Sequence, residues 1–211
     1  MRADRADGAP VADRYPNFAA LKAGEPAHGY AVRICDRGSA VVIVAPHGGA
    51  IEPGTSEVAC AIAGDDLSYY IFEGQKPRNN LDLHLTSSNF DEPSCLALLG
   101  AAERVVTVHG EASREAVVYI GGRDRQLRAA LAVALAGHGF AVASHTSPRM
   151  QGSHARNICN LGRAGAGVQL ELAGGLRRRL LGPRSAPSKE RAARIACFAA
   201  AVRQVLCADG L

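Results

Sequence analysis

The sequence predicts an α/β fold, built as a single domain around a mixed, largely parallel sheet that lies between helices. Three observations predict this class. Short apolar runs alternate along the chain with longer stretches in which apolar residues recur at helical spacing. The apolar runs lack strict period-two alternation, which is typical of strands buried on both faces. A length of 211 residues is sufficient for one substantial core.

Short apolar segments are expected to form the strands. The first two are separated by the polar sequence DRGS, which predicts two strands joined by a tight turn. The predicted strands are GYAVRIC (29–35), AVVIVA (40–45), LSYYIFEG (67–74), ERVVTVHG (103–110), AVVYIGG (116–122), FAVAS (140–144) and GVQLEL (167–172).

Three segments are expected to be helical. EVACAIAG (57–64) follows Thr55 and Ser56, either of which can cap a helix, and ends at Gly64. The other two have apolar residues at helical spacing, and Gly139 would end the first of them. They are RDRQLRAALAVALAGHG (123–139) and RAARIACFAAAVRQVLCA (191–208).

The first residues are polar and charged. We expect residues 1–27 to form a loosely packed lead-in and residues 28–211 to form the folded domain. The N-terminus has no apolar segment, so neither a signal peptide nor a membrane span is expected and a cytoplasmic location follows. Six scattered cysteines without a CxxC pair suggest buried, reduced thiols.

The charge balance limits the class of partner. The net charge is +4, but 21 arginines stand against 3 lysines, and tryptophan is absent. Without lysine-rich runs or many aromatic residues to stack on bases, a nucleic-acid partner is not expected. An arginine-rich surface is equally suited to an anionic small or polymeric substrate.

Polar side chains occur at the C-terminal ends of three predicted strands. His47 follows VVIVAP, His109 follows VVTV, and Glu171 lies within VQLEL. Ligands bind at this edge of open α/β sheets. The three residues can therefore converge although they are far apart in the sequence.

The stretch APHGGAIEPGTSE (45–57) could supply part of a metal site. His47 and Glu52 can bind one ion if the glycines between them let the chain fold back, and His109 would complete three ligands. A catalytic zinc needs three such ligands and an open fourth position for water. The alternative is an ordinary glycine turn with a solvated glutamate.

Six segments, in order, resemble the poly-γ-glutamate hydrolase family of phages and bacteria: APHGGAIEPGTSE, LTSSNFDEP, VVTVHG, VYIGG, RNICN and GVQLELAGGLRR. The resemblance covers roughly residues 28–208. It implies a zinc hydrolase with a carboxypeptidase A-like sandwich fold and one Zn²⁺ per chain.

The resemblance also implies roles for particular residues. His47, Glu52 and His109 match the zinc ligands, and Glu171 matches the glutamate that acts as general base in carboxypeptidase-like enzymes. Classical carboxypeptidases have two residues between the histidine and the glutamate, whereas this chain has four. Glu57 therefore stays an alternative ligand, although its place suits the first turn of a helix.

The expected substrate carries a free α-carboxylate at every glutamate, so guanidinium and amide groups should lie near the metal. The candidates are Arg156, Asn157, Asn160 and Arg177, with the neighbouring Arg178 and Arg179. The alternative for each arginine is a solvated surface residue. His84, His138, His145 and His154 are interpreted as structural, with His145 and His154 able to border the site. Tyr119 is interpreted as a core residue, with the alternative that it is the phenol that assists some carboxypeptidase-like enzymes.

The main hypothesis is a zinc-dependent hydrolase that cleaves γ-glutamyl amide bonds with metal-activated water and a glutamate base. One alternative is a desuccinylase-like or deacylase-like amidohydrolase acting on a small N-acyl amino acid. Another is a non-catalytic module that binds an anionic polymer, which would not need a general base. No membrane partner is expected, and a phage-derived enzyme would be released by lysis.

Overall fold

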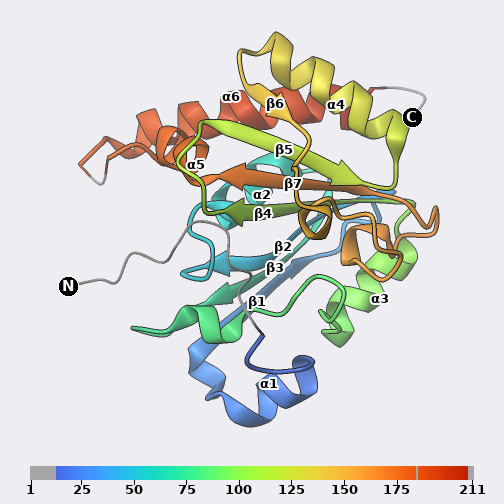
Figure 1. Cartoon of the computed structure of the whole chain (residues 1–211), viewed down its shortest axis with the longest axis vertical. Coiled ribbons are helices and arrows are strands. Elements are labelled where there is room, and N and C mark those ends of the chain that lie inside the picture. Colours follow the sequence, from blue (N-terminus) through green and yellow to red (C-terminus); the bar gives the residue numbers. More distant parts are fainter. Residues whose placement is uncertain (1–12, 184, 209–211) are drawn as a thin grey trace.

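The computed structural model describes residues 13–183 and 185–208. A seven-stranded sheet of order β1-β3-β2-β4-β7-β5-β6 runs through the molecule (Figure 1). Four of its six pairings are parallel, and the β1–β3 and β5–β7 pairings are antiparallel. The predicted α/β class and its largely parallel sheet are confirmed. The strands are β1 (Tyr30–Cys35), β2 (Val41–Gly49), β3 (Ser68–Gly74), β4 (Arg104–Glu111), β5 (Val117–Gly122), β6 (Ala141–Ala143) and β7 (Val168–Ala173).

Helices cover both faces of the sheet and divide the core into two clusters. α2, α4, α5 and α6 pack on one face, and α1 and α3 pack on the other. β2 contributes to both clusters, because Ile43 faces the first and Val42 and Val44 face the second. The helices are α1 (Phe18–Gly24), α2 (Thr55–Ala63), α3 (Pro93–Ala101), α4 (Arg125–Gly137), α5 (Gly174–Leu181) and α6 (Ser188–Leu206). Short 3₁₀ turns lie at Ala27–Gly29, Asn80–Leu83, Pro148–Met150 and Ile158–Asn160.

The strand order corrects one expectation from the sequence. DRGS does separate β1 from β2, but these strands do not pair, because β3 lies between them. β3 is antiparallel to β1 and parallel to β2. The polar turn therefore changes the direction of the chain without making a hairpin.

The start of α2 also differs from the expected cap. Gly54 is the N-cap residue, with φ of 101°, and Thr55 and Ser56 lie inside the helix. Their hydroxyls hold the preceding loop instead. Thr55 Oγ1 donates to the Glu52 carbonyl at 2.9 Å, and Ser56 Oγ accepts the Gly49 N–H at 2.9 Å. The prediction of a hydroxyl cap was wrong because these side chains bond backward into the loop.

Part of the predicted lead-in packs against the domain. Residues 1–12 lie outside the described residues. In the rest, Asn17 caps α1 by accepting the Ala20 N–H at 2.9 Å, and α1 buries Phe18 and Leu21 in the core on the α3 face. The boundary at residue 28 stays a prediction.

Two further expectations concern membranes and cysteines. Across residues 13–183 and 185–208, no helix is both long and apolar enough to cross a bilayer. All six cysteines are free thiols. Cys95 and Cys159 are buried, but Cys197 and Cys207 are exposed, so the expectation of buried thiols holds for only some of them.

Gly48 lies where the chain leaves no room for a side chain. A Cβ atom at this position would stand 2.9 Å from the Phe72 carbonyl oxygen. Gly48→Ala is expected to lower the free energy of unfolding by about 1–3 kcal/mol through overpacking. Gly100→Ala is the control, because a Cβ there would meet nothing within 4 Å beyond its chain neighbours and the backbone of α3, and it should raise the free energy of unfolding by about 0.5–1 kcal/mol. Urea unfolding measures both changes, and an equal response of the two variants would contradict the prediction.

Candidate active site

Three neighbouring parallel strands bring the predicted site residues to one edge of the sheet. β2 pairs with β4, β4 pairs with β7, and all three end at the same edge. His47 lies near the end of β2, while His109 of β4 is the register partner of Glu171 of β7. Paired residues on parallel strands project from the same face.

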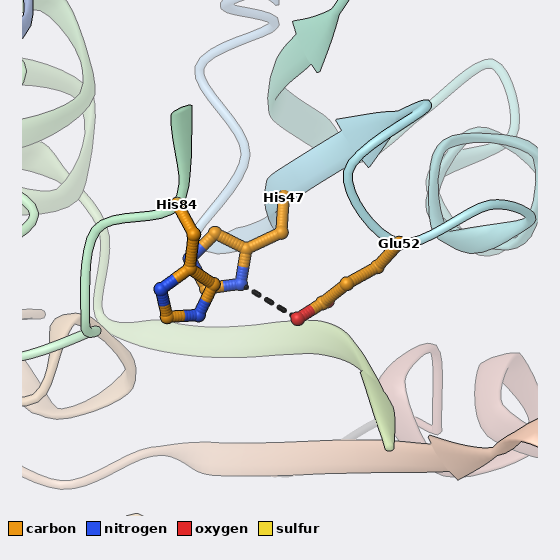
Figure 2. A group of neighbouring side chains, drawn as sticks. All are labelled: His47, Glu52 and His84. Carbon is orange, nitrogen blue, oxygen red and sulfur yellow. Dashed lines mark hydrogen bonds and ion pairs between the residues drawn. The ribbon is translucent and has the colours of Figure 1, made fainter. Parts of the chain in front are cut away.

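His47 is oriented from outside the cluster by a backbone carbonyl. Its Nε2 lies 2.8 Å from the Leu85 carbonyl oxygen, which can only accept, so Nε2 carries the hydrogen. Nδ1 lies 3.0 Å from Glu52 Oε1 (Figure 2). Without a metal this contact needs a hydrogen on Nδ1: burial lowers the pKa of His47, but the charge and hydrogen bond of Glu52 raise it overall. With a metal bound, the neutral ring would present the Nδ1 lone pair instead. A histidine ligand held in this way is typical of metal sites.

His109 meets His47 from the neighbouring strand. The two Nδ1 atoms are 3.2 Å apart, and His109 Nδ1 is 3.9 Å from Glu52 Oε2. The outer nitrogen of His109, Nε2, lies 3.3 Å from Ser87 Oγ, which can accept its hydrogen. Both inner nitrogens can therefore present lone pairs to the same point.

Glu52 is held in the cluster by the turn that follows His47. The Glu52 N–H donates to the His47 carbonyl at 2.8 Å, and the Gly110 N–H donates to Glu52 Oε2 at 2.7 Å. Gly110 is needed for this approach, since a Cβ atom there would lie 2.9 Å from Glu52 Cβ. Burial raises the pKa of Glu52, but the charge and hydrogen bond of His47 outweigh burial and lower that pKa to about 2.

The spacing of the inner atoms is compatible with a zinc ion. His47 Nδ1 lies 3.0 Å from Glu52 Oε1 and 3.2 Å from His109 Nδ1, and His109 Nδ1 lies 3.9 Å from the other carboxylate oxygen, Glu52 Oε2. Ligands at about 2.0–2.1 Å in tetrahedral geometry stand roughly 3.3 Å apart. Two Nδ1 lone pairs facing each other repel unless a cation or a proton lies between them. The donor set of two imidazoles and one carboxylate is also one that zinc accepts.

His84 also lies beside this cluster and was interpreted from the sequence as structural. Its ring stacks on the His47 ring with centroids 4.1 Å apart, and one nitrogen lies within 4.8 Å of ligand atoms of His47 and Glu52 (Figure 2). Its Nδ1 lies 2.9 Å from Asp13 Oδ1. The available signal was its position directly before LTSSNFDEP, one of the six matching segments.

Ring orientation favours His109 over His84 as the third ligand. Nitrogen lone pairs lie in the plane of the imidazole ring. The rings of His84 and His47 are stacked with an interplanar angle of 30°, so their lone pairs lie in nearly parallel planes. The rings of His109 and His47 are inclined at 63°, which allows their lone pairs to converge.

Glu52, and not Glu57, is the carboxylate in the cluster. Glu57 is exposed in the first turn of α2, where an acidic side chain interacts favourably with the helix dipole. The β2 bulge between Ala45 and Gly48 includes His47, and the turn that follows brings Glu52 back to it, with the Glu52 N–H donating to the His47 carbonyl. The longer spacing is therefore compatible with a shared site.

Glu171 is buried beside His109, with 4% of its surface exposed. Burial raises its pKa well above the usual value, and the carboxylates of Glu52 and Glu111 raise it further. Gln169 donates an amide hydrogen to Glu171 Oε1 at 2.8 Å. A buried carboxylate with a raised pKa is suited to accept and return a proton.

Arg177 is engaged by the backbone around the site. Its guanidinium donates to the carbonyl oxygens of Leu172 at 3.1 Å, Pro53 at 3.1 Å and Glu111 at 2.9 Å. These bonds tie together the ends of β7, the Glu52 loop and β4. Arg177 therefore supports the site wall, and a contact with substrate stays a prediction.

The RNICN segment is likewise bonded within the chain. Asn157 donates to Gln169 Oε1 at 2.9 Å. The side chain of Asn160 bonds four backbone groups, two as acceptor and two as donor. Arg156 is exposed in the same segment. A substrate contact for Arg156, Asn157 or Asn160 stays a prediction.

Tyr119 lies on β5 as the register partner of Glu171. Its hydroxyl donates to Glu115 Oε2 at 3.0 Å, and its ring packs edge-on against His145 with centroids 4.8 Å apart. Tyr119 and His145 therefore border the Glu171 side of the sheet edge.

Comparisons with known proteins show what this chain is similar to. The sequence model of the poly-gamma-glutamate hydrolase family matches residues 15–203. UPF0714 protein YndL of Bacillus subtilis (strain 168) is 40% identical over 171 residues, which are 81% of this chain and 68% of YndL. The SPbeta prophage-derived UPF0714 protein YoqZ of the same strain is 38% identical over 171 residues, which are 81% of this chain and 62% of YoqZ.

Two solved structures resemble this chain over most of its length. A bacteriophage poly-gamma-glutamate hydrolase superposes with a TM-score of 0.85 at 28% identity, covering 93% of this chain and 97% of the phage protein. Zinc-free YndL superposes with a TM-score of 0.86 at 36% identity, covering 95% of this chain and 100% of YndL. The chain belongs to the poly-gamma-glutamate hydrolase family, as the six sequence segments predicted.

Proposed function

We propose that this chain is a zinc-dependent hydrolase that cleaves the γ-glutamyl amide bonds of poly-γ-glutamate. The observation that carries the proposal is the cluster of His47, Glu52 and His109 beside buried Glu171, in which the two Nδ1 atoms and the Glu52 carboxylate make contacts of 3.0–3.9 Å. Membership of the poly-gamma-glutamate hydrolase family supports the substrate class.

In this proposal His47, Glu52 and His109 hold one zinc ion per chain. When bound, zinc would lower the pKa of a water molecule and polarise the carbonyl of the scissile amide. The Leu85 carbonyl, the Ser87 hydroxyl and the Gly110 N–H hold the three ligands from outside. Such outer partners fix the tautomer and direction of each ligand.

Glu171 is the general base in this proposal. Its carboxylate takes a proton from the attacking water, whose oxygen forms a bond to the γ-carbonyl carbon. The carbon–nitrogen bond then breaks, and Glu171 returns the proton to the leaving nitrogen. The products are a chain with a free γ-carboxylate and a chain with a free amine. The raised pKa of Glu171 makes it a stronger base than an exposed glutamate.

The substrate is an anionic polymer, and the arginine-rich chain carries a net charge of +4. A guanidinium is well matched to the α-carboxylates of such a polymer. Arg156 is exposed in the segment that leads to β7, which makes it the first arginine to examine as a substrate contact. Arg177 supports the site wall through its three carbonyl bonds.

Two other functions remain to be separated by experiment. A desuccinylase-like or deacylase-like enzyme would release one acid from a small N-acyl amino acid. A binding module would hold the polymer without cutting it. The buried Glu171 is an argument against the binding module. Burying a carboxylate costs free energy, and a module that only binds the polymer does not need a general base.

Purified protein should shorten poly-γ-glutamate, and the cleavage should depend on zinc. A chelator is expected to abolish the release of new amino ends, and added zinc is expected to restore it, since zinc supplies the Lewis acid. Size-exclusion chromatography and titration of free amines measure cutting, and metal analysis measures zinc. Full activity of metal-free protein would overturn the mechanism. Activity on N-acyl amino acids alone would favour the small-substrate function, and polymer binding without cutting would favour the module.

A further inference from the structure

We propose that Asn157 and Gln169 are positioning residues that fix the orientation of the Glu171 carboxylate. The inference rests on the proposed function, in which Glu171 is the general base. The three side chains form a continuous hydrogen-bonded chain. They are exposed by only 7%, 3% and 4% respectively, so water competes little for these bonds.

A backbone N–H group sets the direction in which hydrogen bonds are donated from Asn157 to Gln169 and on to Glu171. The Cys159 N–H can only donate, and it donates to Asn157 Oδ1 at 3.0 Å. Because Oδ1 faces the Cys159 N–H, Nδ2 lies on the opposite side of the Asn157 amide. Nδ2 donates to Gln169 Oε1 at 2.9 Å. The assignment of oxygen and nitrogen in Asn157 thus follows from the Cys159 contact.

The orientation of Gln169 follows in the same way. Because Gln169 Oε1 accepts from Asn157, Nε2 must face the opposite side. It has two hydrogens, and it donates one to the Met150 carbonyl at 3.1 Å and the other to Glu171 Oε1 at 2.8 Å. Each polar atom of the Gln169 amide therefore has a partner, and a flipped amide would lose all of these bonds.

The consequence for Glu171 is an asymmetry between its two oxygens. Oε1 accepts the hydrogen bond from Gln169, so the carboxylate cannot rotate without losing it. In the residues that the structure describes, Oε2 receives no such hydrogen bond. Oε2 is therefore the oxygen left to exchange a proton with water and the leaving nitrogen.

The hydrogen-bonded side chains of Asn157, Gln169 and Glu171 do more than fill space in the core. Gln169 is flanked on β7 by the apolar Val168 and Leu170, and a buried amide costs free energy unless its hydrogen bonds are made. An aliphatic side chain would fill the same volume without that requirement. The bonds made by this amide link the segment containing Met150 and Asn157 to the catalytic carboxylate.

The test is Asn157→Asp, which keeps the size of the side chain but replaces the donor with an acceptor. Gln169 must then flip and turn its oxygen toward Glu171, or leave bonds unmade. Turnover is expected to fall by about 10- to 100-fold, the scale of a small misplacement of a reacting group. The KM for the polymer and the zinc content should stay close to those of the wild type. A purely structural role would not separate kcat from KM in this way.

Gln169→Met is the second variant, and it carries the test if Asn157→Asp fails to fold. Methionine approximates the length of glutamine and cannot donate, so the same loss of kcat with retained zinc is expected. Asn80→Asp is the control. Asn80 is also buried, and among the described residues its amide bonds only the backbone of Lys76, at 2.9 and 2.7 Å. This control should lose stability and keep kcat.

The outcomes distinguish this inference from the proposed function. Wild-type kcat in folded Asn157→Asp and Gln169→Met would overturn the positioning role. An equal loss of kcat in Asn80→Asp would also overturn it, because the loss would then follow stability alone. If both variants keep kcat while Glu171→Gln loses it, the general base stands and only the positioning role fails. If Glu171→Gln keeps kcat, the proposed mechanism itself fails.

Discussion

Replacing Glu171 by Gln is expected to reduce turnover by about 100- to 10,000-fold while zinc and folding are retained. Glutamine keeps the shape of the side chain and can still accept the hydrogen bond from Gln169, but it cannot take a proton. The site around Glu171 favours this role, because burial and the carboxylates of Glu52 and Glu111 raise its pKa. The measurement combines steady-state kinetics on poly-γ-glutamate with metal analysis.

Glu103→Gln is the matched control for that experiment. Glu103 is an exposed carboxylate that pairs with Arg163 at 3.2 Å, so its change to an amide should leave turnover unaltered. If the Glu171→Gln protein loses its zinc, the result identifies Glu171 as a zinc ligand. Near-normal turnover would remove Glu171 from the mechanism, and attention would pass to Glu111, whose Oε2 is buried without a hydrogen-bond partner in the described part of the chain.

The strands could be predicted from the sequence because each one is a local apolar run. Their order could not, because β3 enters between β1 and β2, and β7 enters between β4 and β5. These pairings join segments far apart in the chain, and no local pattern encodes them. The short helices α1, α3 and α5 were missed for a related reason. They have only 7–9 residues, and they are stabilised by packing more than by their own sequence.

The proposed ligands could be found from the sequence, but the groups that orient them could not. His47, Glu52 and His109 follow from the glycine-rich loop, the strand ends and the family resemblance. The Leu85 carbonyl and the Ser87 hydroxyl come from an irregular segment after the Asn80–Leu83 turn, where periodicity gives no information. Leu85 and Ser87 are far from His47 and His109 in the sequence, and it is the tertiary fold that brings them into contact.

The predicted substrate contacts depend on the neighbours of each side chain as well as on its type. The sequence suggests Asn157 because an amide can bind a carboxylate, and that contact stays a prediction. In the folded chain that amide bonds to Gln169 and to the Cys159 N–H. Residue type predicts which bonds a side chain can make, whereas burial and neighbours decide whether the partner is substrate or protein.

His109→Ala is expected to cost most of the bound zinc together with activity. His109 supplies one of only three proposed ligands, and its Nδ1 lies 3.2 Å from that of His47. Loss of a ligand should weaken zinc binding by more than the roughly 10- to 100-fold that loss of an outer partner costs. Competition with a chromogenic chelator measures the affinity without depending on turnover. His138→Ala, at an exposed helix end, is the control and should bind zinc as the wild type does.

His84→Ala decides between the two candidates for the third ligand. Stacked rings 4.1 Å apart hold their lone pairs in nearly parallel planes, so removal of His84 should change zinc affinity much less than removal of His109. If His84→Ala loses zinc and His109→Ala retains it, the ligand set is His47, Glu52 and His84. Retention of full zinc affinity by both variants would mean that His47 and Glu52 bind the ion with a ligand outside this cluster. We expect His109→Ala to lose far more zinc affinity than His84→Ala, because the 63° inclination between the His109 and His47 rings lets both imidazoles bind one ion.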